Sequence, residues 1–367
     1  MQRRCPVAVM RGGSSRALVF RAEDLPEDVD AQDRIFLAAL GCPDPTGRQV
    51  DGLGGGASSN NKVAIVAPSR EPGVDLDYTF CQLSPNRSGV DRAGNCGNIS
   101  SAIGPFAIEA GMVPARAGAT AVTIRNTNSG RLIVAQVPTP GGRFEPEGDF
   151  EIGGVPGSGA KIVLDFVEPG GSAGRGDLPS GRPSEELANP GFGAVRCSLV
   201  DAGKPCVIVP FAELGLTAAV RPEELDADPA LLERIEAVRA AGAVAMGLAP
   251  DPAAATPSLP QIALFAPAGP RELRVLGISM GNAHRSLPLT AAIGFAAASG
   301  IEGTLVATAL AAADGEERAL TLVHPSGRIE VAASFAPGAD RPHLERVSVA
   351  RTARRLFEGS VYVDAGG

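Results

Sequence analysis

Two stretches of small residues, one in each half of the chain, limit the folds that this sequence can adopt. "NISSAIGPFAIEAG" starts at residue 98 and "PLTAAIGFAAASG" starts at residue 288. Both contain Ala-Ile-Gly, both are dense in small side chains, and both end in Gly, a residue that commonly follows the last turn of a helix. We therefore expect two helices in equivalent places of a duplicated structure.

The two halves also begin alike. The segments "VAVMRGGSSRALVF" and "RCSLVDAGKPCVIV" each read as a strand, a tight polar turn and a second strand. A duplication would give two similar α+β halves, each directing the N-terminus of one helix toward a shared cleft. Ala- and Gly-rich helices also resemble each other by chance, so a chain without a repeat is the alternative.

The length of the chain sets the number of domains. At 367 residues it is long for a single core and sufficient for two domains. Residues 168–193 are rich in Gly, Ser and Pro without a periodic pattern, which indicates a connection between domains or, alternatively, a long surface loop. We expect an N-terminal half at 1–185 and a C-terminal half at 186–367, with the C-terminal segment packing back on the first half.

Elsewhere the sequence predicts short strands separated by turns, which 46 Gly and 31 Pro favour. The expected strands include 62–67, 76–82, 261–266, 272–278 and 304–309. Helices are expected at 29–40, 98–110, 229–247, 287–298 and 350–356.

Charge and composition exclude several classes of function. The net charge of −8 argues against nucleic-acid binding, and no apolar run reaches the roughly 18 residues of a membrane span. Six cysteines are scattered without C-x-x-C spacing or neighbouring histidines, which indicates reduced thiols and neither disulfides nor a zinc site. We therefore expect a cytoplasmic protein without a metal or cofactor. A homodimer is a possible assembly.

The segment "DRAGNCGNISSAIG" places Cys96 between two glycines and two asparagines, at the start of the first small-residue helix. Gly94 and Gly97 allow another molecule to approach the backbone closely. The first turn of a helix offers unpaired N–H groups that stabilise a thiolate or bind a carboxylate. This context favours Cys96 as a catalytic acid or base, and a small buried structural residue is the alternative.

In a second segment, "DGLGGGASSNNKVAIV", a run of three consecutive glycines and then four small polar residues precede Lys62, which starts an apolar strand. It is not a phosphate-binding GxxxxGK[ST] loop, because no Ser or Thr follows the lysine and a strand comes next. Burial beside that strand would favour the neutral amine, which can act as a base. An exposed lysine at a strand edge is the alternative interpretation.

Other polar turns add candidate ligands for anions. A lone His284 is more often structural, but its place one turn before a helix and beside Arg285 favours anion binding. The candidate substrate-binding residues are Ser14, Ser15, Arg16, Ser59, Asn60, Asn95, Gly97, Asn98, Lys204, Ser279, His284 and Thr290.

Together these groups predict chemistry on a small polycarboxylate. Arg, Lys, Ser and Asn donors and two helix N-termini would bind several carboxylates within an acidic protein. Lys62 and Cys96 are the strong candidates for proton transfer, and no cofactor motif accompanies them. The combination indicates an isomerisation without a cofactor, in which a proton is abstracted next to a conjugated carboxylate and returned elsewhere.

At these residues the sequence resembles the 2-methylaconitate cis-trans isomerase family, which includes methylitaconate Δ-isomerase and 4-oxalomesaconate tautomerase. The resemblance spans nearly the whole chain and is carried by "MRGGSSRALVF", "DGLGGGASSNNKVAIV", "AGNCGNISSAIGPFAIEAGMV", "DAGKPCVIV", "SMGNAHRSLPLT", "EGTLV", "HPSG" and "RTARRLFEGSVYV". It implies a diaminopimelate-epimerase-like α+β fold of two pseudo-symmetric halves, each a mainly antiparallel sheet wrapped around a central helix. The family's catalytic lysine and cysteine match Lys62 and Cys96.

The sequence departs from the family pattern in three places. Ser-Ser-Arg at 14–16 stands where the family usually has Thr, Ser and Lys, and Asn-Asn at 60–61 replaces a Thr-Ser pair. Relatives of the diaminopimelate-epimerase type use two cysteines, one per half, whereas no cysteine lies near 284–290. A symmetric two-thiol racemase is therefore disfavoured.

The resemblance implies a cofactor-independent isomerase that moves a proton in an unsaturated di- or tricarboxylate of aconitate type. Cis-trans isomerisation and a double-bond shift would share one dienolate intermediate. The alternatives are keto-enol tautomerisation of 4-oxalomesaconate and an accessory role, in which the protein binds an aconitase-like dehydratase or its product. Retention of both Lys62 and Cys96 argues against a purely binding role.

Overall fold

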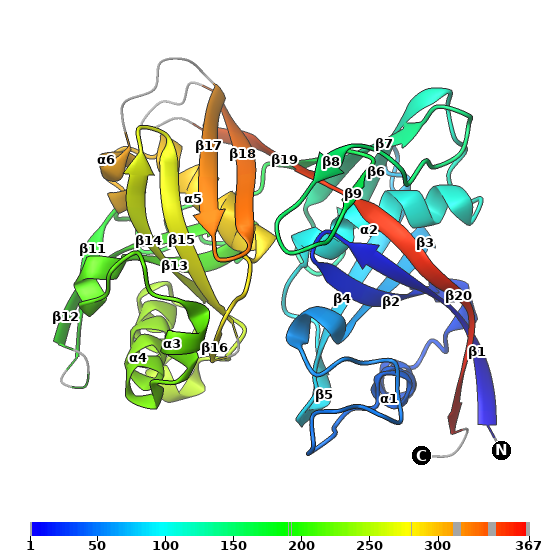
Figure 1. Cartoon of the computed structure of the whole chain (residues 1–367), viewed down its shortest axis with the longest axis horizontal. Coiled ribbons are helices and arrows are strands. Elements are labelled where there is room, and N and C mark those ends of the chain that lie inside the picture. The colour runs from blue at the N-terminus through cyan, green and yellow to red at the C-terminus, as the bar shows by residue number, and fades with distance from the viewer. Residues whose placement is uncertain are drawn as a thin grey trace. The chain divides into compact units, whose positions relative to one another are not determined.

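The computed structural model describes residues 2–189, 191, 193–279, 281–310, 317–336 and 343–364. The chain forms two compact units (Figure 1). Unit 1 consists of Met1–Leu164 and Arg351–Gly367, and unit 2 consists of Asp165–Ala350. Unit 1 is thus discontinuous in sequence, and the domain boundary expected after residue 185 lies within unit 2.

The frame of unit 1 is a mixed sheet built around a buried helix. Its main strands are β1 (Gln2–Gly12), β2 (Ser15–Arg21), β3 (Lys62–Pro68), β4 (Leu76–Ser84), β6 (Gly118–Asn126) and β7 (Leu132–Thr139). The pairs β1–β2, β3–β4 and β6–β7 are antiparallel, whereas β2–β3 and β4–β6 are parallel. Helix α2 (Gly97–Glu109) follows β4 and is buried from its first residue to Ile108.

Unit 2 repeats this order of strands. Its main strands are β12 (Gly193–Ala202), β13 (Lys204–Pro210), β14 (Gln261–Gly269), β15 (Glu272–Ser279), β17 (Glu317–His324) and β18 (Gly327–Ala336). Successive pairs are again antiparallel, parallel, antiparallel, parallel and antiparallel. Helix α5 (Leu289–Gly300) follows β15 and is buried along its whole length. The two small-residue segments are therefore the equivalent central helices of two halves with the same topology.

Small residues let each central helix approach its sheet closely. A Cβ added to Gly104 of α2 would lie 2.9 Å from Val137 of β7. A Cβ added to Gly300 of α5 would lie 2.0 Å from the ring of Phe335 in β18. The two glycines occupy different positions along their helices, but each faces one of two equivalent strands, β7 and β18. Each central helix therefore needs a small residue where it approaches that strand.

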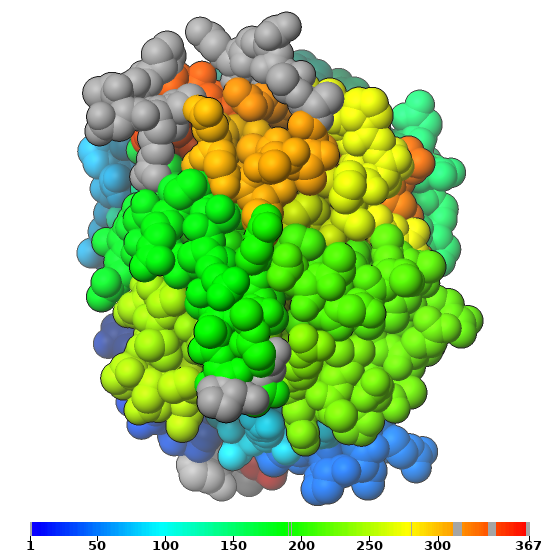
Figure 2. Space-filling view, turned by 90° about the vertical axis from the view of Figure 1, so that its left-hand side faces the viewer, coloured from blue at the N-terminus to red at the C-terminus, as the bar shows by residue number. Residues whose placement is uncertain are grey.

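One further helix or helix pair covers a sheet face in each unit. Helix α1 (Val29–Leu40) begins where Asp28 Oδ1 accepts a hydrogen bond from the N–H of Ala31 (2.8 Å), and its Phe36 belongs to the same apolar cluster as Val63 of β3. Helix α4 (Pro229–Ala245) is preceded by α3 (Pro222–Asp226). Both lie on the surface of unit 2, in the light-green region of Figure 2.

The C-terminal strands return the chain to unit 1. Strand β19 (His343–Arg351) pairs with β18, and β20 (Ala353–Asp364) pairs antiparallel with β1 from Gln2↔Asp364 to Gly12↔Ala353. The prediction of a helix at 350–356 is therefore wrong. Its Ala-, Arg- and Leu-rich composition favours a helix locally, but pairing along β1 overrides that propensity.

The prediction of a strand at 304–309 is also wrong. This segment forms the short helix α6 (Leu305–Ala309), because the hydroxyl of Thr304 accepts a hydrogen bond from the N–H of Ala307 (3.0 Å) and caps the first turn. The remaining strands are β5 (Arg87–Asp91), β8 (Phe150–Glu151), β9 (Ser158–Gly159), β10 (Ile162–Val167), β11 (Glu185–Asn189) and β16 (Asn282–Ala283). Among the described residues, no helix has both the length and the apolar character needed to cross a membrane.

Candidate active site

Lys62 is the first residue of β3 and is 8% exposed. Its Nζ donates a hydrogen bond to Gln82 Oε1 (2.6 Å) and lies 5.2 Å from the centre of the Phe80 ring. Lys62 is paired with Gln82 in the β3–β4 register, so the contact is built into the sheet. The alternative of an exposed lysine at a strand edge does not describe this side chain.

The side chain of Gln82 is held in one orientation. Its Nε2 donates to the carbonyls of Ser58 (3.1 Å), Asn61 (3.0 Å) and Leu83 (2.9 Å). Because the amide nitrogen faces these three acceptors, the amide oxygen must face Lys62. Sequence reasoning missed Gln82, since its role appears only once the register of β3 and β4 is known.

A buried amide network holds the loop that precedes Lys62. Asn61 Nδ2 donates to Gln49 Oε1 (3.0 Å) and to the carbonyl of Ala57 (2.9 Å). Gln49 Nε2 donates to Asn61 Oδ1 and to the carbonyl of Leu40 (2.9 Å) at the end of α1. The network therefore ties the start of β3 to α1 and limits the movement of Lys62.

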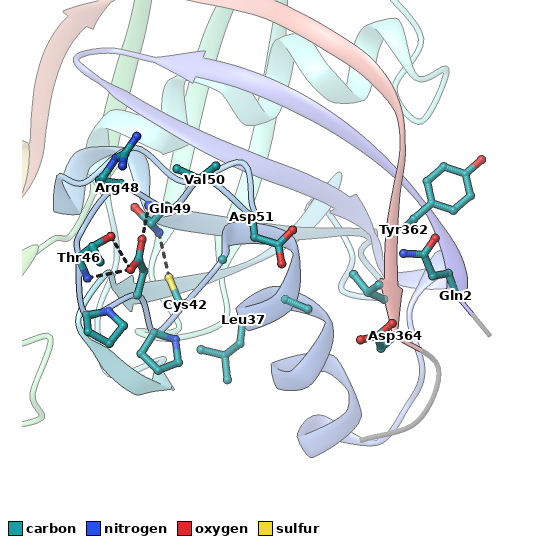
Figure 3. Close-up of a pocket in the computed structure, with 16 residues that line it drawn as sticks. Gln2, Leu37, Cys42, Thr46, Arg48, Gln49, Val50, Asp51, Tyr362 and Asp364 are labelled. Carbon is teal, nitrogen blue, oxygen red and sulfur yellow. Dashed lines mark hydrogen bonds between the residues drawn. The ribbon is translucent and has the colours of Figure 1, made fainter.

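A pocket with a volume of about 570 Å³ lies beside this network in unit 1 (Figure 3). It is lined by the loop after α1, including Cys42 and Asp44, and by the end of β20. Hydrogen bonds from the backbone N–H groups of Thr46 and Gln49 hold the pKa of Asp44 below its usual range. Neither Lys62 nor Cys96 lines this pocket, so it is separate from the candidate catalytic groups.

Cys96 is the N-cap residue of α2 and is half-buried. No side chain caps this helix start, and its first turn contains no acidic residue. The hydroxyl of Ser100 donates to the carbonyl of Cys96 (3.1 Å) and lies 3.4 Å from Asn95 Oδ1, which ties the turn to the helix. The N–H groups of Gly97 and Asn98 in the first turn are thus available to an anion.

The other cysteines differ from Cys96 in their surroundings. All six thiols are free, and Cys96 alone among them is more than slightly exposed. Burial raises the pKa of Cys81, Cys197 and Cys206 to about 12, so these groups remain protonated and unreactive near neutral pH. The local contrast supports the interpretation of Cys96 as the candidate catalytic thiol.

One face of β4 connects the two candidate catalytic residues. Successive side chains of a strand point to opposite faces of the sheet. The same side of β4 therefore carries Tyr78, Phe80 and Gln82. Burial raises the pKa of Tyr78 well above its usual value, and the charge of a Cys96 thiolate raises it further. Tyr78 thus lies within electrostatic range of Cys96, while Phe80 and Gln82 contact Lys62.

The β1–β2 turn packs against the start of α2. Asn98 Nδ2 donates to Ser14 Oγ (3.3 Å), and Arg351 Nε donates to Asn98 Oδ1 (3.1 Å). Ser15 is buried at 6% exposure. The structure therefore brings Ser14 and Asn98 together, and it adds Arg351, which sequence reasoning did not single out.

Replacing Gly13 with alanine should destabilise this turn by more than about 1 kcal/mol, the cost of a left-handed conformation for a non-glycine residue. Gly13 has φ +50°, and an added Cβ would lie 2.2 Å from Asn98 Oδ1. Gly111→Ala is a matched control, since Gly111 has φ +70° with nothing within 4 Å. Urea unfolding should show a larger loss for Gly13→Ala, and equal losses would mean that the contact with Asn98 is unimportant.

The remaining candidates of unit 1 lie around the loop before β3. Arg16 Nη2 donates to the carbonyl of Leu53 (2.9 Å), so part of its guanidinium holds the loop. Asn60 lies with Ser59 in a short 3-10 helix at Ser58–Asn60, and its Nδ2 is 3.5 Å from the carbonyl of Gly55. All three side chains are half-buried.

The candidates of unit 2 lie at the ends of strands and at the start of α5. His284 follows β16, its Nδ1 accepts a hydrogen bond from the N–H of Ser286 (3.1 Å), and Ser279 pairs with Asn282. Thr290 lies in the first turn of α5, and Lys204 begins β13 directly after the β12–β13 turn.

Arg285 points toward α3. Its guanidinium forms ion pairs with Glu223 (2.9 Å) and with Asp226 (3.1 Å). These contacts occupy the group that sequence reasoning placed beside His284 as an anion ligand.

Known proteins resemble this chain over nearly its whole length. Residues 2–364 match the model of the family described as PrpF protein. The chain belongs to the PrpF protein family. It is 36% identical over 380 residues to the 2-methyl-aconitate isomerase of Shewanella oneidensis, an alignment that covers 96% of this chain and 95% of the relative.

Solved structures agree with this assignment. The crystal structure of a methylitaconate-delta-isomerase matches this PrpF family member with a TM-score of 0.80 and 33% identity, covering 99% of this chain and 96% of the other. A hydroxyproline epimerase from Agrobacterium vitis matches with a TM-score of 0.63 and 15% identity, covering 100% of this chain and 95% of the other, which shows a common fold. The predicted epimerase-like α+β fold is confirmed.

The equivalent positions of unit 2 carry different chemistry in this PrpF family member. Gln261 begins β14 as Lys62 begins β3, and its Nε2 donates to Thr290 Oγ1 (2.7 Å). The N-cap of α5 is Pro288, and alignment of the two Ala-Ile-Gly segments places Ser286 opposite Cys96. Neither position holds a thiol, so the lysine and cysteine pair occurs in unit 1 alone. The internal repeat could have identified Gln261 from the sequence.

Proposed function

We propose that this protein is a cofactor-independent isomerase that moves a proton within an unsaturated di- or tricarboxylate of aconitate type. The observation that carries the proposal is the arrangement of unit 1. A buried lysine contacts Gln82 and Phe80 on one face of β4, and a half-exposed thiol at an uncapped helix start lies within electrostatic range of Tyr78 on the same face. The names of the relatives, 2-methyl-aconitate isomerase and methylitaconate-delta-isomerase, support the same class of substrate.

The proposed reaction needs one proton acceptor and one proton donor. Neutral Lys62 removes a γ-proton from the substrate: the C–H bond breaks, an N–H bond forms, and the electron pair delocalises into a dienolate. The Cys96 thiol then returns a proton to carbon and becomes a thiolate, or the two residues act in the reverse order. Exchange with solvent takes the proton from the group that gained it and restores one to the group that lost it. Bond rotation in the dienolate gives cis-trans isomerisation, and reprotonation at the far carbon gives a double-bond shift.

Binding of the carboxylates would use the donors around the same face. The first turn of α2, together with Ser14, Asn95 and Asn98, can accept one carboxylate and stabilise charge as it develops on the dienolate. We propose further contacts from Ser15, Arg16, Ser59, Asn60 and Gly97 in unit 1. For unit 2, the substrate-binding candidates Lys204, Ser279, His284 and Thr290 stay predictions from the sequence.

Proton NMR in D₂O with trans-aconitate, methylitaconate and 4-oxalomesaconate tests the proposal. We expect one of these compounds to be converted, with deuterium entering at the carbon that receives the proton. Deuterium in a product of changed geometry identifies cis-trans isomerisation, and deuterium at a newly saturated carbon identifies a double-bond shift. A Lys62→Ala/Cys96→Ser double variant, purified in the same way, controls for contaminating isomerases.

The accessory role makes a different prediction for the same samples. A protein that only binds a dehydratase or its product would exchange no proton with any of the three compounds. Binding detected by calorimetry without exchange would therefore contradict the isomerase proposal. Conversion of 4-oxalomesaconate alone would favour the tautomerase alternative.

Two substitutions at Gln82 test whether Lys62 is the proton acceptor. Gln82→Glu adds a negative charge that favours the ammonium form, so kcat/KM should rise only at higher pH than in wild type. Gln82→Met removes the acceptor that favours the ammonium form, so the rise should move to lower pH. Both variants lose the Nε2 hydrogen bonds, so a general loosening of the loop cannot by itself produce opposite shifts. Two unshifted pH profiles would remove Lys62 from the proton-transfer step.

The location of the protein in the cell, its ligand and its self-association are also proposals. We propose a cytoplasmic location, which the six free cysteines support because oxidising compartments favour disulfides. The proposed partner is a small polycarboxylate without a resident cofactor, and the acidic composition disfavours nucleic acid. Self-association as a homodimer stays a prediction, and light scattering would test it.

A further inference from the structure

Arg351 is a buried charge in unit 1. It is the last residue of β19 and is 5% exposed. Burial lowers the pKa of its guanidinium to about 10, so the group still carries its charge at neutral pH. A buried guanidinium holds its hydrogen-bond partners in a fixed geometry, because its donors are arranged in a rigid plane.

The contact with Asn98 fixes the orientation of an amide. Arg351 Nε donates to Asn98 Oδ1 (3.1 Å), and a guanidinium has no acceptor that could receive a bond from the amide nitrogen. Asn98 Oδ1 must therefore face Arg351, which leaves Nδ2 to donate to Ser14 Oγ (3.3 Å). Asn98 is itself 5% exposed, so the amide cannot exchange this contact for water freely.

The electrostatic surroundings favour an anion at the same place. Asn98 lies in the first turn of α2, where the helix has no side-chain cap and no acidic residue. The partial positive charge of the helix start and the full charge of Arg351 act in the same direction. Together they attract a carboxylate to the N–H groups of the first turn.

We propose that Arg351 is a positioning residue that prepares the start of α2 for one carboxylate of the polycarboxylate substrate. It orients Asn98, through Asn98 it orients Ser14, and its charge makes the position selective for an anion. The inference rests on the proposed function, because it assigns a carboxylate of that substrate to a defined part of unit 1.

Calorimetry with two unreactive ligands tests the inference. Tricarballylate has three carboxylates and no double bond, and glutarate has two carboxylates. Arg351→Gln should weaken tricarballylate binding by about 10-fold or more, the usual effect of losing a charged hydrogen-bonding group, and glutarate binding much less. Arg351→Lys keeps the charge and should retain part of the selectivity. With a converted substrate, KM should rise more than kcat falls.

Two further variants keep the test decisive. Arg354→Gln is the control, since Arg354 is an exposed residue of neighbouring β20. If Arg351→Gln does not fold, Asn98→Ala replaces it, because alanine neither accepts from Arg351 nor donates to Ser14 and adds no charge. An unchanged ratio of tricarballylate to glutarate affinity in a folded variant, with wild type active, overturns this inference alone. A wild-type protein that neither binds tricarballylate nor exchanges protons overturns the proposed function, and this inference with it.

Discussion

Replacing Lys62 with alanine is expected to lower turnover by about 10²–10⁴-fold, the usual contribution of a general acid or base, while unit 1 stays folded. Lys62 is buried, donates to Gln82 Oε1 (2.6 Å) and has its Nζ 5.2 Å from the Phe80 ring, so its amine is held in place before the substrate arrives. Alanine removes the proton acceptor and leaves the amide network of Asn61 intact. Steady-state kinetics and circular dichroism measure the two expectations.

A second lysine provides a matched control for Lys62. Lys161 Nζ lies 5.4 Å from the centre of the Phe150 ring, but Lys161 is exposed. Lys161→Ala should therefore keep wild-type turnover. Added methylamine should restore part of the activity of Lys62→Ala, because a small amine can occupy the vacated space. Normal turnover in Lys62→Ala would remove Lys62 from the reaction, and unfolding of the variant would show that the lysine has a structural role.

Replacing Cys96 with serine is expected to lower turnover by at least about 100-fold, since a hydroxyl is a much poorer acid or base near neutral pH. Cys96 is half-exposed at the start of α2, whereas the other five free cysteines are buried. The side chain makes no capping hydrogen bond, so serine should disturb the helix little. Iodoacetamide should modify Cys96 first, substrate should slow the modification, and mass spectrometry can follow both. Wild-type turnover in Cys96→Ser would contradict the mechanism.

The two variants together assign the roles of acid and base. A variant that has lost only the proton donor can still remove a proton, so the substrate should exchange with D₂O without forming product. A variant that has lost the base should show neither exchange nor product. Exchange in Cys96→Ser and its absence in Lys62→Ala would make Lys62 the base, and the opposite result would reverse the order.

Local sequence signals predicted part of the structure well. The helix expected at 29–40 is observed as Val29–Leu40, because its Asp28 cap and its Gly41 stop are both local signals. The candidates Lys62 and Cys96 were likewise found from their neighbours in sequence. The repeat of Ala-Ile-Gly predicted two equivalent central helices, and α2 and α5 occupy the same place in the strand order of their units.

The features that the sequence did not predict depend on contacts between distant parts of the chain. Residues 353–364 form a strand because they pair with β1, which no local pattern could indicate. Gln82 reaches Lys62 through the β3–β4 register, and Arg351 reaches Asn98 across a sequence separation of 253 residues. Composition around either residue predicts neither contact, since both partners are fixed by tertiary structure.

The return of the chain to unit 1 has a consequence for biosynthesis. A ribosome delivers all of Asp165–Ala350 before it delivers β20, the strand that pairs with β1. Unit 2 is continuous and can fold during translation, although it is encoded after most of unit 1. Thr352, whose carbonyl accepts from the N–H of Gly13 (3.0 Å), and Arg351, which orients Asn98, emerge together with β20. The candidate active site, whose lysine and cysteine are translated early, is therefore the last part of the nascent protein to be completed.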